Sequence, residues 1–410
     1  MISQALARAG AVQVVGPKWC GKTTTARQQA AETKYFQDAD MRAFFERLGQ
    51  EKPSLLLEGK RPLLLDEWQD IPQVWDAVRF AVDQAAAPGQ FLLTGSTAPS
   101  EKALGQVRHS GTGRFAKVRM RTMSLYESGE STGDVSLAAL FEGGEVSGSS
   151  RLDAAGAANA IVRGGWPSSV VLGEKGGERA LDYLESLAEH DISMVDGVEK
   201  NPKRVRLLLR ALARNESSQA AIATIQADMS VDDGHLAINT VNQYLNALRT
   251  LYVLEEQEAW PMSVRSKVAQ RSKPVRRFCD PSLPAAALRL TADKLQVDYN
   301  TFGLFFESLA VRDLRVYAEA ADAVVYHYRD ARGLEADAII ERGDGKWGAV
   351  EVKLSARGQE DAQVTLPQIR EDVCSQHGGP PAFLAVVTNE PLAYTDTEGI
   401  HHIPLGALAP

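Results

Sequence analysis

The chain has 410 residues, of which 44% are hydrophobic and 24% are charged, a composition typical of folded globular proteins with about two to four domains. Its net charge of −8 argues against a protein that coats nucleic acid along its whole surface, although a local basic patch is compatible with it. Three widely separated cysteines indicate neither a disulfide framework nor a zinc site. There is no signal-peptide pattern and no apolar stretch of membrane-spanning length, so we expect a cytoplasmic protein without a membrane partner.

The first predicted strand, residues 12–15, runs into a complete phosphate-binding loop with the pattern G-x-x-x-x-G-K-T, and a helix follows. Gly16 and Gly21 allow the tight backbone path that turns amide groups toward an anion, and the helix adds its positive end. We expect Lys22 to reach the β- and γ-phosphates of ATP and the Thr23 hydroxyl to bind Mg²⁺. The alternative is a glycine-containing turn before an ordinary helix. The predicted nucleotide-contacting residues of this loop are Gly16, Pro17, Lys18, Trp19, Cys20, Gly21, Lys22, Thr23 and Thr24.

Two further predicted strands end in polar residues that would complete a nucleotide site. The apolar run of residues 63–65 is followed by Asp66, an expected Mg²⁺ partner, and by Glu67, which is placed to polarise the attacking water. The strand that begins at residue 90 ends in hydroxyl residues, Thr94 to Thr97. This ending suits a sensor of the γ-phosphate on a strand between the first two, with Ser96 as the predicted contact. The alternative is a strand that simply leaves into a turn.

An arginine finger is predicted among four arginines that follow this strand. Arg114, in Thr-Gly-Arg, is the favoured candidate to reach the γ-phosphate of a neighbouring subunit, which would require a homo-oligomer. For any single one of them, a solvated basic segment is the competing interpretation. The four are Arg108, Arg114, Arg119 and Arg121.

Together, these motifs resemble the AAA-type branch of P-loop ATPases. More specifically, they resemble a prokaryotic family with the signatures LLLDE-x-Q, here residues 63–69, and LLTGS, here residues 92–96. Residues 109–129 are similar to the same family, so the ATPase resemblance covers about the first third of the chain. The resemblance implies ATP hydrolysis with Mg²⁺ and a role in defence, mobile-element or toxin–antitoxin biology.

The same family carries a C-terminal domain of unknown function, and two motifs in the middle of this chain match it. One is the Gly-Gly-Trp-Pro turn at residues 164–167, and the other is the helix 179–191, which ends in Glu-His-Asp. The resemblance implies that they dock a helical domain on the ATPase, and we assign no chemistry to His190 or Asp191. Residues 128–150 are rich in Gly, Ser and Glu and are predicted to be a flexible divider after the ATPase.

The pattern between residues 202 and 260 predicts helices followed by strand-like alternation, an order that resembles a winged helix. Residues 238–249 are the candidate recognition helix, and basic residues on both sides fit a phosphate-contacting footprint, which predicts DNA as a partner. Protein contacts by the winged helix, and simple solvated faces, are the alternatives. The candidates to face a groove are Asn239, Thr240, Asn242, Gln243 and Arg249. The basic residues are Lys200, Lys203, Arg204, Arg206, Arg210, Arg214, Arg265, Lys267, Arg271, Lys273, Arg276 and Arg277.

The last third has an order of acidic residues similar to that of restriction-endonuclease-like nucleases. Glu307 lies on a predicted helix (302–316), Asp337 on one strand and Glu351 and Lys353 on the next. Strand alternation puts Glu351 and Lys353 on one face. Asp337 and Glu351 would hold a divalent cation, with Glu307 completing its shell, and Lys353 would orient or deprotonate the attacking water. The alternatives are a solvated strand edge and a domain of this shape that binds without cutting.

The sequence therefore predicts an α/β protein with four consecutive domains. These are a parallel-sheet AAA-type ATPase domain (1–130), a helical linker (131–200), a winged helix (201–275) and an α/β restriction-endonuclease-like domain (276–410). The leading hypothesis is an ATPase whose nucleotide state repositions a DNA-binding winged helix and a nuclease-like domain. The alternatives are a non-nuclease regulatory ATPase that binds a protein partner through its C-terminal half, and a nucleotide-binding scaffold that barely turns over.

Overall fold

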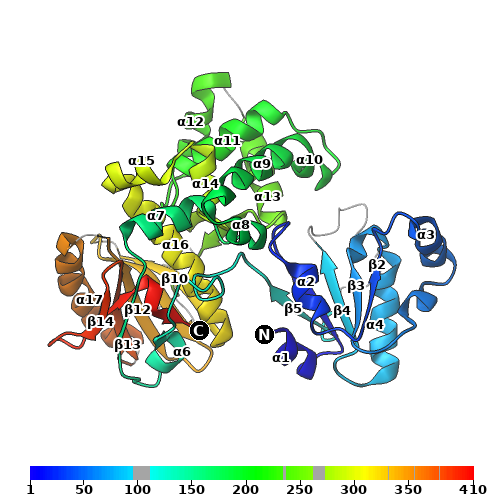
Figure 1. Ribbon diagram of the computed structural model, residues 1–410, viewed down its shortest axis with the longest axis horizontal. Coiled ribbons are helices and arrows are strands. Elements are labelled where there is room, and N and C mark those ends of the chain that lie inside the picture. Colours follow the sequence, from blue (N-terminus) through cyan, green and yellow to red (C-terminus); the bar gives the residue numbers. More distant parts are fainter. Residues whose placement is uncertain (96–110, 234–236, 262–272, 331, 355, 378) are drawn as a thin grey trace. The chain divides into compact units, whose positions relative to one another are not determined.

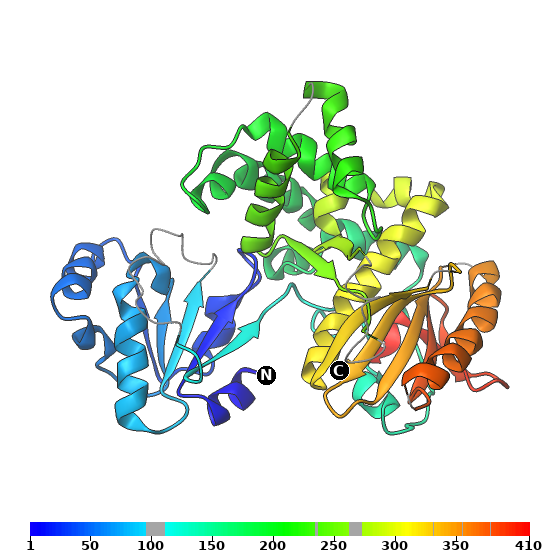
Figure 2. The same ribbon diagram turned by 180° about the vertical axis from the view of Figure 1, so that it is seen from behind.

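The computed structural model describes residues 1–95, 111–233, 237–261, 273–330, 332–354, 356–377 and 379–410. The chain forms two compact units, each built from separate segments (Figures 1 and 2). Two segments from the middle of the chain belong to the first unit, and the four consecutive domains that we expected stay a prediction. Unit 1 comprises Met1–Thr122, Ser186–Pro202 and Gln243–Val253, and unit 2 comprises Met123–Glu185, Lys203–Asn242 and Leu254–Pro410.

Unit 1 is built on a five-stranded, fully parallel sheet with the strand order β2-β3-β4-β1-β5. Its central strands are mostly apolar because both faces are covered. Leu63 and Leu65 of β3 pack with α4 on one face, whereas Leu64 packs with α1 and α2 on the other. The elements are α1 (Ile2–Arg8), β1 (Ala11–Val15), α2 (Lys22–Arg27), β2 (Glu32–Tyr35), α3 (Arg42–Glu51), β3 (Leu63–Asp66), α4 (Gln73–Ala85), β4 (Phe91–Gly95) and β5 (Phe115–Arg119).

Strand β4 lies between β1 and β3, so three chemically different strand ends meet at one edge of the sheet. The parallel register places Val15 beside Gly95, and Asp66 beside Thr94. The expectation that the hydroxyl-ended strand lies between the other two is therefore confirmed. In open parallel sheets, ligands bind at the carboxyl ends of the strands, and this edge carries the phosphate loop.

Two segments from the middle of the chain complete unit 1. The first contains a π-helix (Leu187–Asp191) and α10 (Ile192–Met194). The second begins within α13 (Ile238–Thr250) and includes Tyr252, whose ring centroid lies 5.3 Å from the guanidinium carbon of Arg119 on β5. Unit 1 thus uses residues far beyond the first third of the chain.

Helices dominate the middle of unit 2, and an antiparallel strand pair follows them. After α11, α12 and α13 the strands β8 and β9 pair with each other, an element order that agrees with the one expected from the sequence. The predicted apolar face of α11, from Val205 to Leu212, is buried. The elements are α7 (Ala154–Arg163), α8 (Pro167–Leu172), α9 (Glu178–Ser186), α11 (Pro202–Arg214), α12 (Ile222–Asp233), β8 (Leu254–Gln257), β9 (Val275–Phe278), α14 (Ser282–Ala287) and α15 (Ala292–Val297).

The carboxyl-terminal part of unit 2 is a seven-stranded mixed sheet with the order β10-β11-β12-β13-β15-β14-β7. Helix α16 (Tyr299–Ala320) covers one face of the sheet and α17 (Ala356–His377) covers the other (Figure 2). Ile340 belongs to the core beneath α16, and Ile339 belongs to the core beneath α17. The helices and strands expected in the last third are therefore present. The strands are β10 (Ala323–Arg329), β11 (Glu335–Arg342), β12 (Trp347–Val352), β13 (Phe383–Thr388), β14 (Leu392–Thr395) and β15 (His401–Pro404).

Residues 128–150 are not the flexible divider that we expected. β7 (Gly148–Ser149) pairs with β14, and β6 (Val135–Ser136) pairs with β16 (Leu408–Ala409), so this region is part of unit 2. Helix α6 (Leu137–Leu140) buries both of its leucines in the core beneath α16. The apolar residues of this region are few and lie among many glycines and serines, so the sequence shows no clear helix or strand periodicity there.

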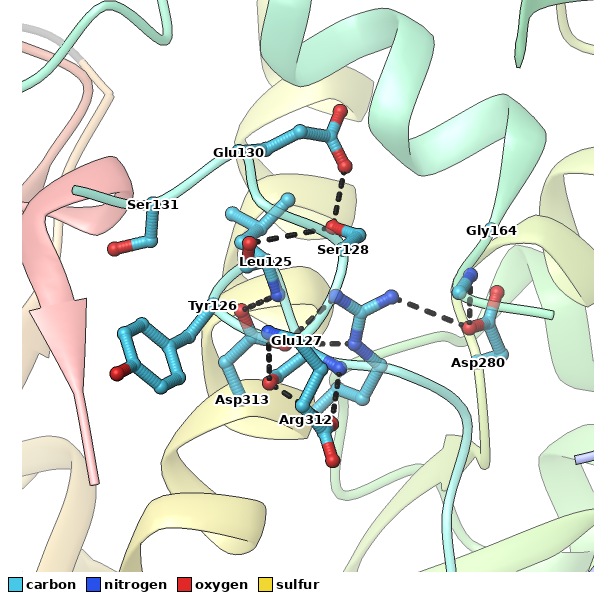
Figure 3. A network of polar contacts seen from close by, with 12 residues as sticks. Leu125, Tyr126, Glu127, Ser128, Glu130, Ser131, Gly164, Asp280, Arg312 and Asp313 are labelled. Carbon is cyan, nitrogen blue, oxygen red and sulfur yellow. Dashed lines mark hydrogen bonds and ion pairs between the residues drawn. The ribbon is translucent and has the colours of Figure 1, made fainter. Parts of the chain in front are cut away.

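A buried polar network fastens the beginning of unit 2 to α16 (Figure 3). The Arg312 guanidinium lies 2.7 Å from the Asp313 carboxylate and 3.2 Å from the Asp280 carboxylate. The backbone amide of Leu125 donates to Asp313 at 2.9 Å, and that of Gly165 donates to Asp280 at 2.9 Å. The three charged side chains are at most 4% exposed, so each needs these partners to stay charged inside the protein.

Candidate active site

The phosphate loop follows β1 and has backbone angles that favour glycine. Gly16 and Gly21 have φ angles of 154° and 97°, and a Cβ on Gly16 would lie 2.1 Å from the Met120 carbonyl oxygen. The buried Lys22 ammonium donates to the carbonyl oxygens of Gly16 and Pro17 at 3.1 and 2.8 Å, and burial lowers the pKa of Lys22. The loop therefore holds the Lys22 ammonium inside the same backbone curve that would enclose a phosphate group.

Asp66 accepts two hydrogen bonds on a single carboxylate oxygen. Thr23 Oγ1 donates to Asp66 Oδ1 at 2.7 Å, and Thr94 Oγ1 donates to the same atom at 2.6 Å. Burial raises the pKa of Asp66, and the two hydroxyl donors oppose that effect. A carboxylate and a hydroxyl at this distance are oxygen ligands of the kind that Mg²⁺ takes, so Thr23 and Asp66 fit the predicted ion.

Glu67 follows directly, with a left-handed backbone conformation (φ 54°) that is uncommon outside glycine. It lies at the end of β3, at the same sheet edge as the phosphate loop. Its carboxylate accepts a hydrogen bond from the side-chain amide of Gln69. A carboxylate in this position can accept a hydrogen bond from a water molecule and orient it.

The other predicted loop residues have different surroundings. Lys18 pairs with Asp191 at 2.7 Å, a contact that the sequence did not reveal because the two residues are 173 positions apart. Trp19 is 56% exposed. Cys20 is buried, which raises the pKa of its thiol, and it is therefore a poor candidate for easy oxidation. Thr24 is exposed on the first turn of α2.

The structure does not bring Arg114 to the nucleotide site of its own chain. Arg114 precedes β5, at the sheet edge opposite the phosphate loop, and pairs with Asp83 at 2.8 Å. A finger that reaches a second subunit stays a prediction. Arg119 instead lies at the carboxyl end of β5, on the phosphate-loop edge. Ser96 and Arg108 lie outside the described residues.

The predicted DNA-contacting residues divide into exposed and buried groups. Lys203 and Arg210 are exposed on α11. Lys200, Arg276 and Arg277 are buried, at 3%, 9% and 2% exposure, and pair with groups of their own units, so their assignment to a phosphate footprint was wrong. Basic side chains in a buried strand pair satisfy internal carboxylates, which a charge count along the sequence does not reveal. Arg265, Lys267 and Arg271 lie outside the described residues.

The carboxyl-terminal acidic residues converge in unit 2. Lys353 Nζ lies 2.5 Å from a carboxylate oxygen of Glu351 and 3.3 Å from one of Asp337. Glu307, on α16, forms an ion pair with Arg277 of β9. Burial, with a further contribution from the Asp337 charge, raises the pKa of Glu307 to about 8 and raises that of Glu351 in the same direction. The three carboxylates therefore share one poorly solvated site.

This acidic cluster does not have the form of a metal site. Within the described ranges, no three His, Cys, Asp or Glu side chains are grouped so that they could hold a metal ion. The Lys353 ammonium stands within salt-bridge distance of both predicted ligands, Asp337 and Glu351, and supplies the positive charge there. The role of these residues as ligands of a divalent cation therefore stays a prediction.

Three family matches cover most of the chain. Residues 8–129 match a family described as AAA domain, which agrees with the loop, the acidic strand end and the sheet described above. An AAA-type ATPase domain occupies the first third of this chain. Residues 156–294 match a domain of unknown function (DUF8612), and residues 302–408 match another (DUF4143). The AAA domain supports ATP binding and hydrolysis, and the expected C-terminal domain of unknown function is confirmed.

Related proteins also match the chain beyond the AAA domain. An uncharacterized protein of Mycobacterium bovis and one of Mycobacterium tuberculosis are each 26% identical over 354 residues, which cover 85% of this chain and 71% of each relative. A solved structure, the Walker-type ATPase of Pyrococcus abyssi, has a TM-score of 0.44 and 13% sequence identity and covers 70% of this chain and 93% of that one. Among the described residues, no helix combines the length and the apolarity that crossing a membrane requires.

Proposed function

We propose that this protein hydrolyses ATP at the edge of the unit 1 sheet and that its nucleotide state governs the activity of unit 2. The observation that carries the proposal is the pair of hydrogen bonds by which Thr23 and Thr94 share one oxygen of Asp66. These bonds join the phosphate loop, the acidic strand end and the hydroxyl-ended strand at one point. Phosphoryl transfer to water needs that combination of groups.

Each residue has its own task in this reaction. Lys22 and the amide groups of the loop bind the β- and γ-phosphates. Thr23 and Asp66 hold Mg²⁺, which supplies positive charge beside the phosphates. Glu67 accepts a hydrogen bond from the attacking water and orients it toward the γ-phosphate. Thr94 fixes the orientation of the Asp66 carboxylate from the neighbouring strand.

Phosphate release by the parent and by Glu67→Gln tests this function. The variant is expected to bind ATP but to turn it over about 100-fold more slowly, because an amide is a poor acceptor for a proton of water. Glu51→Gln, an exposed residue at the end of α3, is the matched control and should keep the parental rate. Equal rates in the parent and Glu67→Gln would remove Glu67 from its role, and a parental rate near background would support a scaffold that barely turns over.

DNA is the proposed partner of unit 2. The exposed basic residues of α11, Lys203 and Arg210, support this in a chain whose net charge is −8. The ATPase rate is then expected to rise with duplex DNA and this stimulation to fall as salt increases from about 50 to 200 mM. Lys203→Ala/Arg210→Ala should weaken the stimulation, whereas Lys52→Ala, an exposed lysine after α3, should not. RNA and single-stranded DNA serve as competing polymers, and no response to any polymer would contradict the proposal.

Nuclease activity is a second candidate function, supported by the convergence of Glu307, Asp337, Glu351 and Lys353. Cleavage of plasmid or single-stranded DNA in the presence of Mg²⁺ or Mn²⁺, lost in Asp337→Ala and in Lys353→Ala, would support it. If both variants cut as well as the parent, or if no metal gives cutting, the nuclease candidate is excluded.

A role in defence, mobile-element or toxin–antitoxin biology, and a homo-oligomer with Arg114 as a finger, belong to the same proposal.

One observation favours the alternative of a regulatory ATPase whose C-terminal half binds a protein. In the acidic cluster, Lys353 pairs with both Asp337 and Glu351, and Arg277 pairs with Glu307, so two cations of the same unit offset much of its negative charge. A cluster of this kind stabilises a fold without needing a metal or a substrate. Under this alternative, Lys353→Met lowers the urea midpoint of unit 2. Neither the parent nor the variant then shows stimulation of the ATPase by DNA or cleavage of DNA.

A further inference from the structure

We propose that Gln69 is a positioning residue that holds the Glu67 carboxylate for water activation, and that Gly95 provides the space that Gln69 needs. The inference rests on the proposed ATPase function and deepens it. It connects the last residue of the LLLDE-x-Q signature with the glycine of the LLTGS signature, two motifs on different strands. Neither Gln69 nor Gly95 has a role in the sequence prediction.

The first observation is the contact between Gln69 and Glu67. Gln69 Nε2 donates a hydrogen bond to Glu67 Oε2. The orientation of the amide follows from its chemistry, because its oxygen would be repelled by a carboxylate. Glu67 turns the chain in a left-handed conformation directly after β3, and Gln69 lies in the short 3-10 helix that follows (Trp68–Asp70). The backbone turn and this hydrogen bond together fix where the carboxylate lies.

The second observation concerns Gly95, the last residue of β4. A Cβ at this position would lie 2.4 Å from Gln69 Oε1 and 3.3 Å from Gln69 Cδ, and the first distance is shorter than real contacts allow. The φ angle of Gly95 is outside the left-handed region, so its backbone does not require glycine. Glycine is therefore needed at position 95 because it leaves space for the Gln69 amide, and not because the backbone turns there.

The third observation is that an amide at position 69 does not serve stability. Gln69 Oε1 is buried and has no hydrogen-bond donor among the described residues. Trp68 Nε1, which lies 3.5 Å from the same Cβ position, likewise has no acceptor among them. Burial of an unsatisfied polar atom opposes folding, and an apolar side chain at position 69 would avoid that cost. The hydrogen bond from Nε2 to Glu67 explains why an amide stands there.

Substitutions at the two positions test the proposal together. Gln69→Ala and Gly95→Ala are each expected to lower kcat for phosphate release at least about tenfold. The dissociation constant for ATP should change less than about twofold in both, because neither residue belongs to the phosphate loop. In the Gln69→Ala background, adding Gly95→Ala should have no further effect on kcat, because the new methyl group then has no amide to displace.

The controls separate positioning from a structural role. Gln84→Ala, an exposed glutamine on α4, should leave kcat unchanged. Additive losses in the double variant, a parental kcat in Gln69→Ala, or a loss of ATP binding that parallels the loss of kcat would overturn the inference. If the parent releases no phosphate above background, the proposed ATPase function fails as well, whereas a parental rate in Glu67→Gln removes only the role of Glu67. If Glu67→Gln is inactive while Gln69→Ala is fully active, only the role of Gln69 fails.

Discussion

The Lys18 ammonium of the phosphate loop lies 2.7 Å from the Asp191 carboxylate at the end of the π-helix. π-Helical turns are rare and occur frequently at functional sites. The Lys18 side chain is 36% exposed, so the ion pair is weak enough for a phosphate group to compete with Asp191 for the lysine. The pair therefore connects nucleotide binding to the segment 186–202, which sequence reasoning had assigned only a docking role.

Asp191→Asn is expected to tighten ATP binding by up to about fivefold, because it releases the Lys18 ammonium beside the phosphate loop. The effect should be larger at low salt. Calorimetric titration with ATP at two salt concentrations measures it. The double variant Lys18→Met/Asp191→Asn should lose the gain, and Asp182→Asn, an exposed aspartate on α9, should show none. Weaker binding in Asp191→Asn would contradict the expectation.

Lys22→Met should weaken ATP binding by about 10- to 100-fold, because it removes a charge-assisted contact to the phosphates. Equilibrium binding of ATP in the presence of Mg²⁺ provides the measurement. The control Lys52→Met makes the same substitution at an exposed position and should bind ATP as tightly as the parent. An unchanged affinity in Lys22→Met would mean that the nucleotide binds elsewhere.

Asp280→Asn should destabilise unit 2 by about 3–5 kcal/mol, because it leaves the buried Arg312 guanidinium with one counter-ion fewer. The midpoint and slope of urea unfolding, followed by circular dichroism, report the change. Glu142→Gln disrupts an exposed ion pair with Arg342 and should leave the midpoint unchanged. Similar shifts of the urea midpoint in both variants would show that the buried ion pair contributes no more to stability than the exposed one.

Stability should depend on pH through Glu216, which is buried against Ser308. Burial raises the pKa of Glu216 from 4.5 to about 7 in the folded state. Folding therefore favours the protonated form of Glu216. The resulting contribution to the free energy of unfolding is fully present below pH 4.5 and is lost as the pH rises to about 7. Relative to the parent, Glu216→Gln should gain about 3 kcal/mol between pH 5 and 8. Urea unfolding across this range measures it, with the exposed Glu398→Gln as control, and a parallel pH profile in parent and variant would exclude the effect.

The arrangement of the candidate nucleotide site could be predicted from the sequence because its determinants are local. The phosphate loop from Gly16 to Thr23 is continuous in sequence, and Asp66 follows a buried strand directly. Parallel strands then bring their carboxyl ends to one edge, so that even the contact of Thr94 with Asp66 follows from strand order. The helix and strands of the last third were predictable for the same reason, since their apolar periodicity is regular.

What the sequence did not reveal depends on contacts between distant segments. Arg114 was favoured as a finger, yet the strand begins one residue later and leaves it at the opposite sheet edge. Arg277 looked like a surface charge, although it lies in a buried strand beside Glu307. The pairing of Lys18 with Asp191 and the space that Gly95 leaves for Gln69 depend on side-chain packing, which no spacing rule encodes.

During synthesis, β6 emerges from the ribosome long before residues 408–409, the strand with which it pairs. The leucines of α6 likewise remain without their packing partner until α16 is made, about 160 residues later. Unit 1 is also incomplete until residues 243–253 have been made. A nascent chain of this protein therefore exposes apolar surface from both units at the same time, and we expect it to depend on chaperones until residues 408–409 have been made.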